Sequence, residues 1–182
     1  MDKEARFFER IVRDRYWLKM PEVIETIPFG NRTFFSKYKR IDEPLSDTVI
    51  NRHRAHRLTA ALPLADKNGN VPFIVIDYNG DTPKHFYHHA GKVLKSLGFE
   101  DLVTFQSKTA THLHLYVATG GTALQHAVEM GKIISEKLEE KMSRQWRVFP
   151  TDTLPDAYNI INLPYKLFMP GGSEGVFYER AK

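Results

Sequence analysis

The sequence predicts a single α+β domain in which helices pack on one face of a mostly antiparallel sheet. Three observations support this fold class. Strand-like and helix-like segments follow in the order strand pair, helix, strand pair, helix. A helix that follows a buried strand packs back onto its sheet. The 182 residues, 42% hydrophobic and 26% charged, suit one globular domain. We expect residues 1–182 to form one domain, with a core at about 53–168 and residues 1–50 packed on it.

Composition excludes several classes of protein. Cysteine is absent, which excludes disulfides, thiolate metal sites and a cysteine nucleophile. The chain has no run of about 18 apolar residues, and its first ten residues mix acids and bases, so we expect neither a membrane span nor a signal peptide. We therefore expect a cytoplasmic protein without membrane contact. Its net charge of +4 suits a phosphate-bearing partner or an ordinary solvated surface, and specifies no oligomeric state.

The first 50 residues are predicted to begin with an amphipathic helix over residues 2–17, followed by an irregular aromatic segment over 21–50. The helix has an apolar stripe of Phe7, Phe8, Ile11, Val12 and Tyr16. The later segment contains strand-like pieces such as Arg32–Tyr38. The aromatic side chains of this region can stack on nucleic-acid bases or form a packed N-terminal core.

The next segment is predicted to form two strands, Arg57–Leu64 and Val71–Asn79, joined by a turn over residues 66–70. The turn contains an Asn-Gly pair, which accepts positive φ at low cost. The uninterrupted apolar run Phe73–Ile76 indicates a strand that is buried on both faces.

Two helices and a second strand pair follow. The first helix, at about 83–97, has Thr82 as its candidate N-cap and Gly98 at its end. The remaining expected elements are the strands Leu102–Ser107 and His112–Ala118, a helix over about 122–142 after Gly120-Gly121, loop and strand over 146–168, and a possible last strand Val176–Tyr178.

The first candidate site lies at the end of the buried strand. Asp77 and Asn79 share a face there, because side chains alternate along a strand. A carboxylate at this position is costly unless it has a partner, and a divalent metal is one such partner. Alternatively, Asp77 caps the following helix or binds backbone amides in a turn.

The second candidate site is the segment that begins with Ser107 and Lys108. His112 and His114 share a face of the expected strand. Two imidazoles on one face can bind a metal or contact a phosphate. Taken alone, the pair more often represents two satisfied, half-exposed histidines on an ordinary antiparallel strand.

The third candidate site contains Asp152 and Asp156, which precede a short apolar strand ending in Leu163-Pro164. On local grounds, a turn that leads into an edge strand is the favoured interpretation of this segment.

Taken in order, these segments resemble the three motifs of the archaeo-eukaryotic primase-polymerase superfamily. The matching residues are Asp77-Tyr78-Asn79 for the acidic first motif, Ser107 to His112 for the small-x-His second motif, and Asp152 or Asp156 for the acid of the third. The resemblance covers about residues 53–168. The whole chain is also similar to a small uncharacterised family of epsilonproteobacterial proteins thought to share this fold.

The resemblance implies a primase-polymerase-like palm with a divalent-metal site for Mg²⁺ or Mn²⁺ and for a nucleotide or nucleic acid. Carried over by position, the metal ligands are Asp77, Asn79 and Asp152. The catalytic residues are Asp77, His112, Asp152 and Asp156. The nucleotide contacts are His112, His114, Ser107 and Lys108.

The sequence departs from the family pattern at its charged positions. Asn79 stands where a second acid is expected, and its neutral amide weakens metal binding and transition-state stabilisation. Asn159 and Asn162 stand where arginine is common. We therefore expect a degenerate site that binds nucleotide or nucleic acid with weak or absent nucleotidyl transfer. The alternatives are a metal-dependent enzyme of another class, built on Asp77, His112 and His114, and a non-catalytic interaction scaffold.

Two further clusters have both a functional and a structural interpretation. Asp81, His85 and His89 are spaced by four, with His88 beside them, so they form either an exposed zinc site or a polar helix face. The basic stretch 52–57 either follows a phosphate backbone or is a solvated segment.

Overall fold

The structure is a computed structural model that describes residues 2–155 and 158–170. Its helices are α1 (Lys3–Arg10), α2 (Asp47–Arg54), α3 (Pro83–Ser96) and α4 (Leu124–Glu139). Its strands are β1 (Tyr16–Lys19), β2 (Glu25–Phe29), β3 (Arg32–Ser36), β4 (Tyr38–Ile41), β5 (Ala60–Pro63), β6 (Asn70–Tyr78), β7 (Leu102–Gln106), β8 (Leu113–Ala123), β9 (Trp146–Phe149), β10 (Ile160–Asn162) and β11 (Lys166–Leu167). The possible strand Val176–Tyr178 lies outside the described residues.

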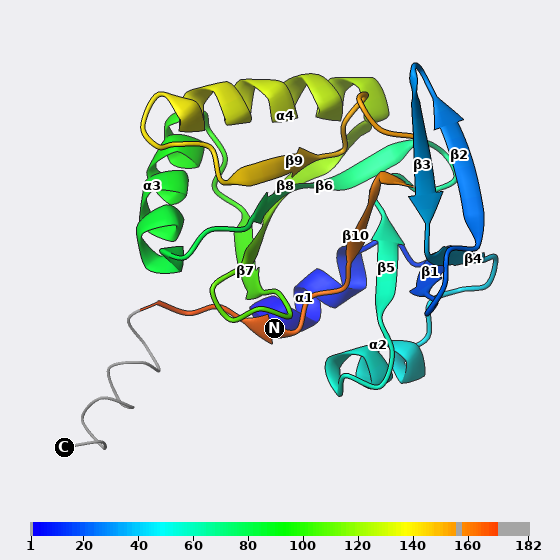
Figure 1. Cartoon of the computed structure of the whole chain (residues 1–182). Coiled ribbons are helices and arrows are strands. Elements are labelled where there is room, and N and C mark those ends of the chain that lie inside the picture. Colours follow the sequence, from blue (N-terminus) through cyan, green and yellow to red (C-terminus); the bar gives the residue numbers. More distant parts are fainter. Residues whose placement is uncertain (1, 156–157, 171–182) are drawn as a thin grey trace.

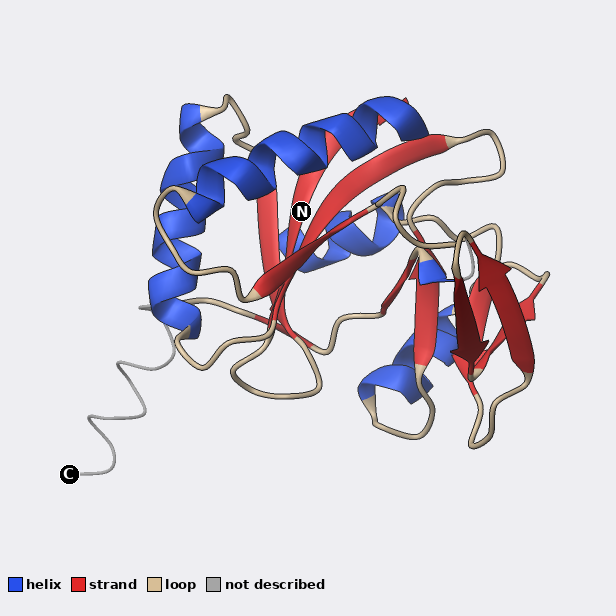
Figure 2. Ribbon diagram, turned by 45° about the horizontal axis from the view of Figure 1, so that its top comes forward, coloured by secondary structure: helices blue, strands red, loops and turns tan. Residues whose placement is uncertain are grey.

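The strands form two main sheets and a hairpin, and every described pairing is antiparallel. One sheet has the order β10-β5-β1-β4, the other has the order β11-β7-β8-β6-β9, and β2 pairs with β3. The two main sheets lie side by side (Figures 1 and 2). The α+β class and the antiparallel pairing confirm the sequence prediction, although the expected single sheet is divided in two.

Strand β6 is the centre of the larger sheet, because it pairs with both β8 and β9. As predicted, its apolar run is buried on both faces. Ile74 and Ile76 belong to the hydrophobic cluster that includes residues of α3 and α4, the two helices that cover one face in Figure 1. Phe73 and Val75 belong to a second cluster, shared with the smaller sheet and α1. Side-chain alternation therefore places Asp77 on the face toward the smaller sheet.

Helix α1 packs on this second face, so the helices do not all lie on one face as expected. Phe7, which is 1% exposed, has its ring centroid 5.3 Å from that of Phe73, 4.8 Å from that of Phe105 and 4.5 Å from that of Tyr116. Both faces of β6 can be apolar because a helical layer covers one and α1 with the second sheet covers the other.

The N-terminal helix is shorter than predicted. It ends at Arg10, and the residues from Tyr16 to Lys19 form β1. The apolar side chains after Arg10 fit a helical stripe, but they include β-branched and aromatic residues that pack well in a sheet. Sheet pairing therefore determines the conformation of Tyr16, which lies opposite Ile41 of β4.

The first predicted hairpin is also wrong. The turn over residues 66–70 forms, with Asp66 Oδ1 accepting from the backbone N–H groups of Asn68 and Asn70. However, the strands on either side of it belong to different sheets. The turn therefore carries the chain from one sheet to the other. The second predicted hairpin, β7 with β8, is confirmed.

Helix α2 contains the first half of the basic stretch, residues 52–54, and was not predicted. Ser46 caps it by accepting a hydrogen bond from the backbone N–H of Val49. A helix of 8 residues is too short to show a clear apolar period, although Ser46 followed by Asp47 is a recognisable start signal.

No helix within residues 2–155 and 158–170 has the length and apolar character needed to cross a membrane.

Candidate functional site

A cleft of about 620 Å³ lies where the two main sheets and the β2–β3 hairpin meet. Strands β6, β8 and β9 contribute from the larger sheet, and β1, β4 and β10 contribute from the smaller one. All three predicted site segments therefore reach the same cavity. The end of β6 contributes Asp77 and Asn79, the β7–β8 hairpin contributes Ser107 and His114, and the third segment contributes Leu154, Tyr158 and residues 160–162, although Asp152 does not line the cleft.

Asp77 occupies the centre of this cleft because of its position in the sheet. It pairs in register with His114 of β8 on one side and with Arg147 of β9 on the other. His114 Nε2 lies 3.4 Å from Asp77 Oδ1, and Arg147 Nη2 donates to Asp77 Oδ2 at 3.1 Å. Both carboxylate oxygens therefore already have a partner within the protein.

The environment of Asp77 favours its ionised form. Burial acts to raise its pKa, but the hydrogen bond and charge of His114, together with Arg147, outweigh burial and leave the pKa below its usual value. Asp77 is 5% exposed, whereas the Arg147 side chain is 65% exposed. The ion pair therefore joins a buried carboxylate to a solvent-exposed guanidinium.

Two buried polar atoms near Asp77 lack a hydrogen-bond partner among the described residues: His114 Nδ1 and the Tyr116 hydroxyl. Burial, with a smaller contribution from the Asp77 charge, raises the pKa of Tyr116, so this hydroxyl stays neutral. Both side chains come from β8 and are spaced by two residues, which places them on the same face of the sheet.

The remaining polar wall of the cleft is made of amides and hydroxyls. Asn79 Nδ2 donates to the backbone carbonyl of Asp77 at 3.4 Å. On the opposite wall, the Tyr38 hydroxyl donates to Asn162 Oδ1 at 2.8 Å. Ser107 also lines the cleft. These groups can donate to or accept from a bound ligand.

Cations and aromatic rings form the outer part of the cleft. Lys19, Arg32 and Lys37 line it, and the described part of the chain provides no carboxylate partner for any of them. Arg32 lies over the Phe34 ring, with its guanidinium carbon 4.9 Å from the ring centroid. The Phe34 and Tyr158 ring centroids are 4.8 Å apart.

The described side chains do not fit a pair of divalent ions. Such a site needs several acidic oxygens, whereas Asp77 is the single acid among the described residues that line the cleft. Its two oxygens are engaged by His114 and Arg147. Within residues 2–155 and 158–170, no group of three or more histidines or acids could hold a metal ion.

Several predicted site residues lie away from the cleft. His112 precedes β8, in the loop where its N–H donates to the Thr109 carbonyl, and Lys108 is exposed in the same loop. Asp152 is on the surface, where its hydrogen bond with Lys132 lowers its pKa. Asp156 lies outside the described residues.

Sequence reasoning missed Arg147, as well as Lys19 and Lys37 at the cleft. Arg147 had one detectable signal: it is a cation within the apolar strand Trp146–Phe149, with burial at both strand ends. Its partner is 70 residues away along the chain, so the pairing of β6 with β9 was needed to show its role.

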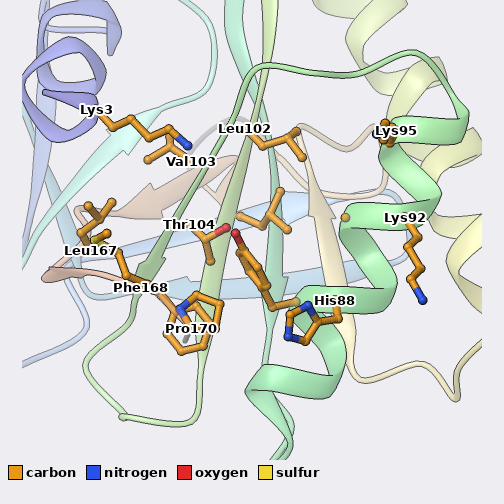
Figure 3. A pocket seen from close by; sticks show the side chains of 14 residues that line it. Lys3, His88, Lys92, Lys95, Leu102, Val103, Thr104, Leu167, Phe168 and Pro170 are labelled. Carbon is orange, nitrogen blue, oxygen red and sulfur yellow. The ribbon is translucent and has the colours of Figure 1, made fainter. Parts of the chain in front are cut away.

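A second cavity, of about 450 Å³, lies between α3, β7 and the end of the described chain (Figure 3). Its walls are mainly apolar, with Lys3, Lys92 and Lys95 around it. It contains no residue of the three predicted sites.

The other two clusters have structural roles. The rings of His85 and His89 contact each other on α3 in a tilted arrangement, with centroids 4.2 Å apart, and the pair lacks a third ligand among the described residues. In the basic stretch, Arg54 pairs with Glu4 at 2.6 Å and donates to the Tyr165 carbonyl. His53 is fully buried.

Comparison with known proteins supports the fold and leaves the function open. A family model described as a domain of unknown function (DUF1882) matches residues 8–72, a segment that ends before Asp77. A comparison with curated proteins finds no match. Among solved structures, the chain is similar to the polymerase domain of Ligase D from Mycobacterium tuberculosis in complex with DNA, at a TM-score of 0.53 and 15% identity.

The alignment with that polymerase domain covers 91% of this chain and 73% of the other. At this identity the likeness concerns the fold. It agrees with the fold that the order of the motifs led us to expect.

Proposed function

We propose that this protein binds the phosphate groups of a nucleotide or a nucleic acid in the cleft between its two sheets, with weak or absent nucleotidyl transfer. The observation that carries this proposal is the charge distribution at the cleft. Among the described residues, four cationic side chains line it, Lys19, Arg32, Lys37 and Arg147, against one carboxylate. Such an excess of positive charge attracts phosphates.

The aromatic side chains at the cleft add a reason to favour a nucleotide-bearing ligand over a simple anion. Phe35 is 60% exposed beside Phe34 and Tyr158, all three of which line the cleft. Exposed aromatic rings next to cations are typical of surfaces on which bases stack while the phosphates are neutralised. The solved structure with a similar fold contains DNA, which agrees with this choice of ligand.

The missing acidic ligands argue for binding over catalysis. Transfer by two metal ions requires carboxylates that hold both ions, and the described cleft offers Asp77 alone. The alternative enzyme built on Asp77, His112 and His114 has no geometric support, because His112 does not line the cleft.

Phosphate binding predicts a salt-dependent affinity that falls when the cleft loses charge. We expect a fluorescent single-stranded oligonucleotide of about 12 residues to bind with a dissociation constant on the order of 10⁻⁴ to 10⁻⁶ M. Replacing Lys19 and Lys37 together by alanine should reduce the slope of log K against log[salt] by about 1.4, at roughly 0.7 for each phosphate contact. Fluorescence anisotropy over a salt series measures both quantities.

The matched control removes two lysines from the second cavity, in the variant Lys92→Ala/Lys95→Ala, and should leave the slope unchanged. Competition with an unlabelled nucleoside triphosphate separates the two ligand sources, since displacement at similar concentrations indicates a mononucleotide site. If both double variants reduce the salt dependence equally, the oligonucleotide binds to positive charge anywhere on the surface and not to the cleft in particular. If the protein binds neither ligand, the proposal is contradicted, and the non-catalytic interaction scaffold becomes the remaining interpretation.

A further inference from the structure

The position of Arg147 indicates how the cleft recognises a phosphate. This inference rests on the phosphate binding proposed above. The guanidinium lies beside Asp77 Oδ2, where a metal ligated by this carboxylate would have to bind. A divalent ion at this place would meet a fixed positive charge and, within the described part of the cleft, a single acidic side chain. Electrostatics therefore disfavour the ion there.

We propose that Arg147 takes the role of a divalent metal in this cleft, binding the phosphate of the ligand directly, so that binding is metal-independent. Asp77 is then a positioning residue that orients the guanidinium. The chemical class of ligand is a phosphate mono- or diester, recognised through paired N–H donors.

The geometry of Arg147 suits this role. A guanidinium has five N–H donors, and the described hydrogen bond to Asp77 uses one, at Nη2. Its carbon atom also lies 5.4 Å from the centroid of the Phe149 ring. An arginine fixed by a carboxylate and an aromatic ring is preorganised for bidentate contact with a phosphate.

The neighbours of Arg147 leave its outer side free for a ligand. Its side chain is 65% exposed, compared with 8% for Asp77 and 5% for His114. Because the carboxylate lies deep in the sheet and the cation faces the cleft, an approaching anion meets the guanidinium first. Lys19 and Lys37 on the opposite side, which have no carboxylate partner among the described residues, add attraction without competing for Asp77.

The first test measures binding of the labelled oligonucleotide, and of a labelled nucleoside triphosphate, in EDTA and in Mn²⁺. For the wild type, we expect affinities within about two-fold of each other in the two conditions. Arg147→Ala should weaken binding by roughly ten-fold or more, the size expected for a lost charge-assisted contact. The affinity of Arg147→Lys should lie between those of the wild type and Arg147→Ala, because lysine keeps the positive charge but loses the paired N–H donors of the guanidinium.

The control is Arg144→Ala. Arg144 is an exposed arginine near the start of the same strand, and it pairs with Glu139 at 3.5 Å. This variant should bind as the wild type does, and urea unfolding of every variant confirms that it is folded. Wild-type binding that requires Mn²⁺, or full affinity in folded Arg147→Ala, would overturn the inference while leaving phosphate binding in the cleft intact. Absence of binding in all conditions would overturn both.

A second test reverses the substitution. The variant Arg147→Asp/Asn79→Asp places two further carboxylates around Asp77. We expect it to bind Mn²⁺ at least ten-fold more tightly than the wild type does, since added charge and ligands govern such affinities. Electron paramagnetic resonance of free Mn²⁺ measures this without any nucleotide. Equal, tight Mn²⁺ binding by the wild type would show that Arg147 does not exclude the metal.

Discussion

Acidification from pH 7 to pH 5 is expected to lower the free energy of unfolding by about 2 kcal/mol through His53 alone. His53 is fully buried. Its Nε2 donates to the Leu163 carbonyl at 2.7 Å, while its Nδ1 accepts from the Ala60 N–H at 3.0 Å. The neutral ring therefore uses both nitrogens, and a second proton would break the bond to Ala60.

The sign of this effect follows from the two pKa values. Burial, the largest cause, lowers the pKa of His53 from 6.5 in the unfolded chain to about 4. The stabilisation is complete above pH 6.5 and is lost as the pH falls toward 4, because the unfolded chain then binds a proton that the folded protein rejects. The full loss amounts to about 3 kcal/mol, at about 1.4 kcal/mol for each pKa unit.

Urea unfolding at several pH values between 7 and 5 measures this slope. His53→Gln should have lower stability at pH 7 and a much flatter pH dependence. His56→Asn is the matched control, because His56 is exposed and has a φ of 58° that asparagine tolerates. This variant should keep nearly all of the wild-type dependence of unfolding free energy on pH, because burial, and not the charge of His56, is the largest cause of the lowered pKa of His53. An unchanged slope in His53→Gln would show that another group is responsible.

His53 also bears on the cleft. It lies in α2 and connects β5, through Ala60, to the residue that follows β10, Leu163. Strand β10 carries Asn162 into the cleft. We therefore expect acid to loosen the wall that holds Asn162 before it disturbs the pairing of β6 with β8.

Phe7→Ala is expected to lower the free energy of unfolding by about 3–5 kcal/mol, the cost of removing a large buried aromatic side chain. Phe7 is 1% exposed, and its ring contacts those of Phe73, Phe105 and Tyr116. Truncation leaves a cavity in the cluster that joins α1 to the larger sheet, and the aromatic neighbours have little freedom to fill it.

Chemical denaturation measures the free energy of unfolding of Phe7→Ala and of the control variant Phe35→Ala. Phe35 is 60% exposed, so its truncation should change stability by no more than about 0.5 kcal/mol. A cost below about 1 kcal/mol for Phe7→Ala would contradict the docking of α1 on the sheet.

The elements that sequence predicted well are those whose signals are local. The apolar run of β6 and the apolar period of α3 come from neighbouring residues, and both elements formed near the predicted bounds. Thr82 precedes α3 as expected, but its side chain makes no capping hydrogen bond. The β7–β8 pair was similarly accessible, because its two strands are separated by one short loop. The division into two sheets was not predictable in this way, since the turn at residues 66–70 fits a hairpin and a sheet-to-sheet connection equally well.

The position of the candidate site could be predicted in outline, whereas the set of side chains that meet in the cleft depended on long-range strand pairing. Asp77 and Asn79 stood out because a carboxylate at the end of an apolar strand needs a partner. The choice between His112 and His114 depended on strand register, and β8 pairs His114 with Asp77. The role of Arg147 could be recognised only from the pairing between β6 and β9, which is a long-range contact that no local sequence pattern contains.

The measurement that tests the central claim most directly is a two-dimensional ¹H–¹⁵N spectrum of the protein during titration with a 5′-phosphorylated thymidine dinucleotide in EDTA. If phosphates bind in the cleft, the amide signals of Asn79, His114 and Arg147 should shift together with one dissociation constant. Those of Lys92 and Lys95 beside the second cavity should not move. Shifts confined to the second cavity, or none at millimolar ligand, would contradict the account.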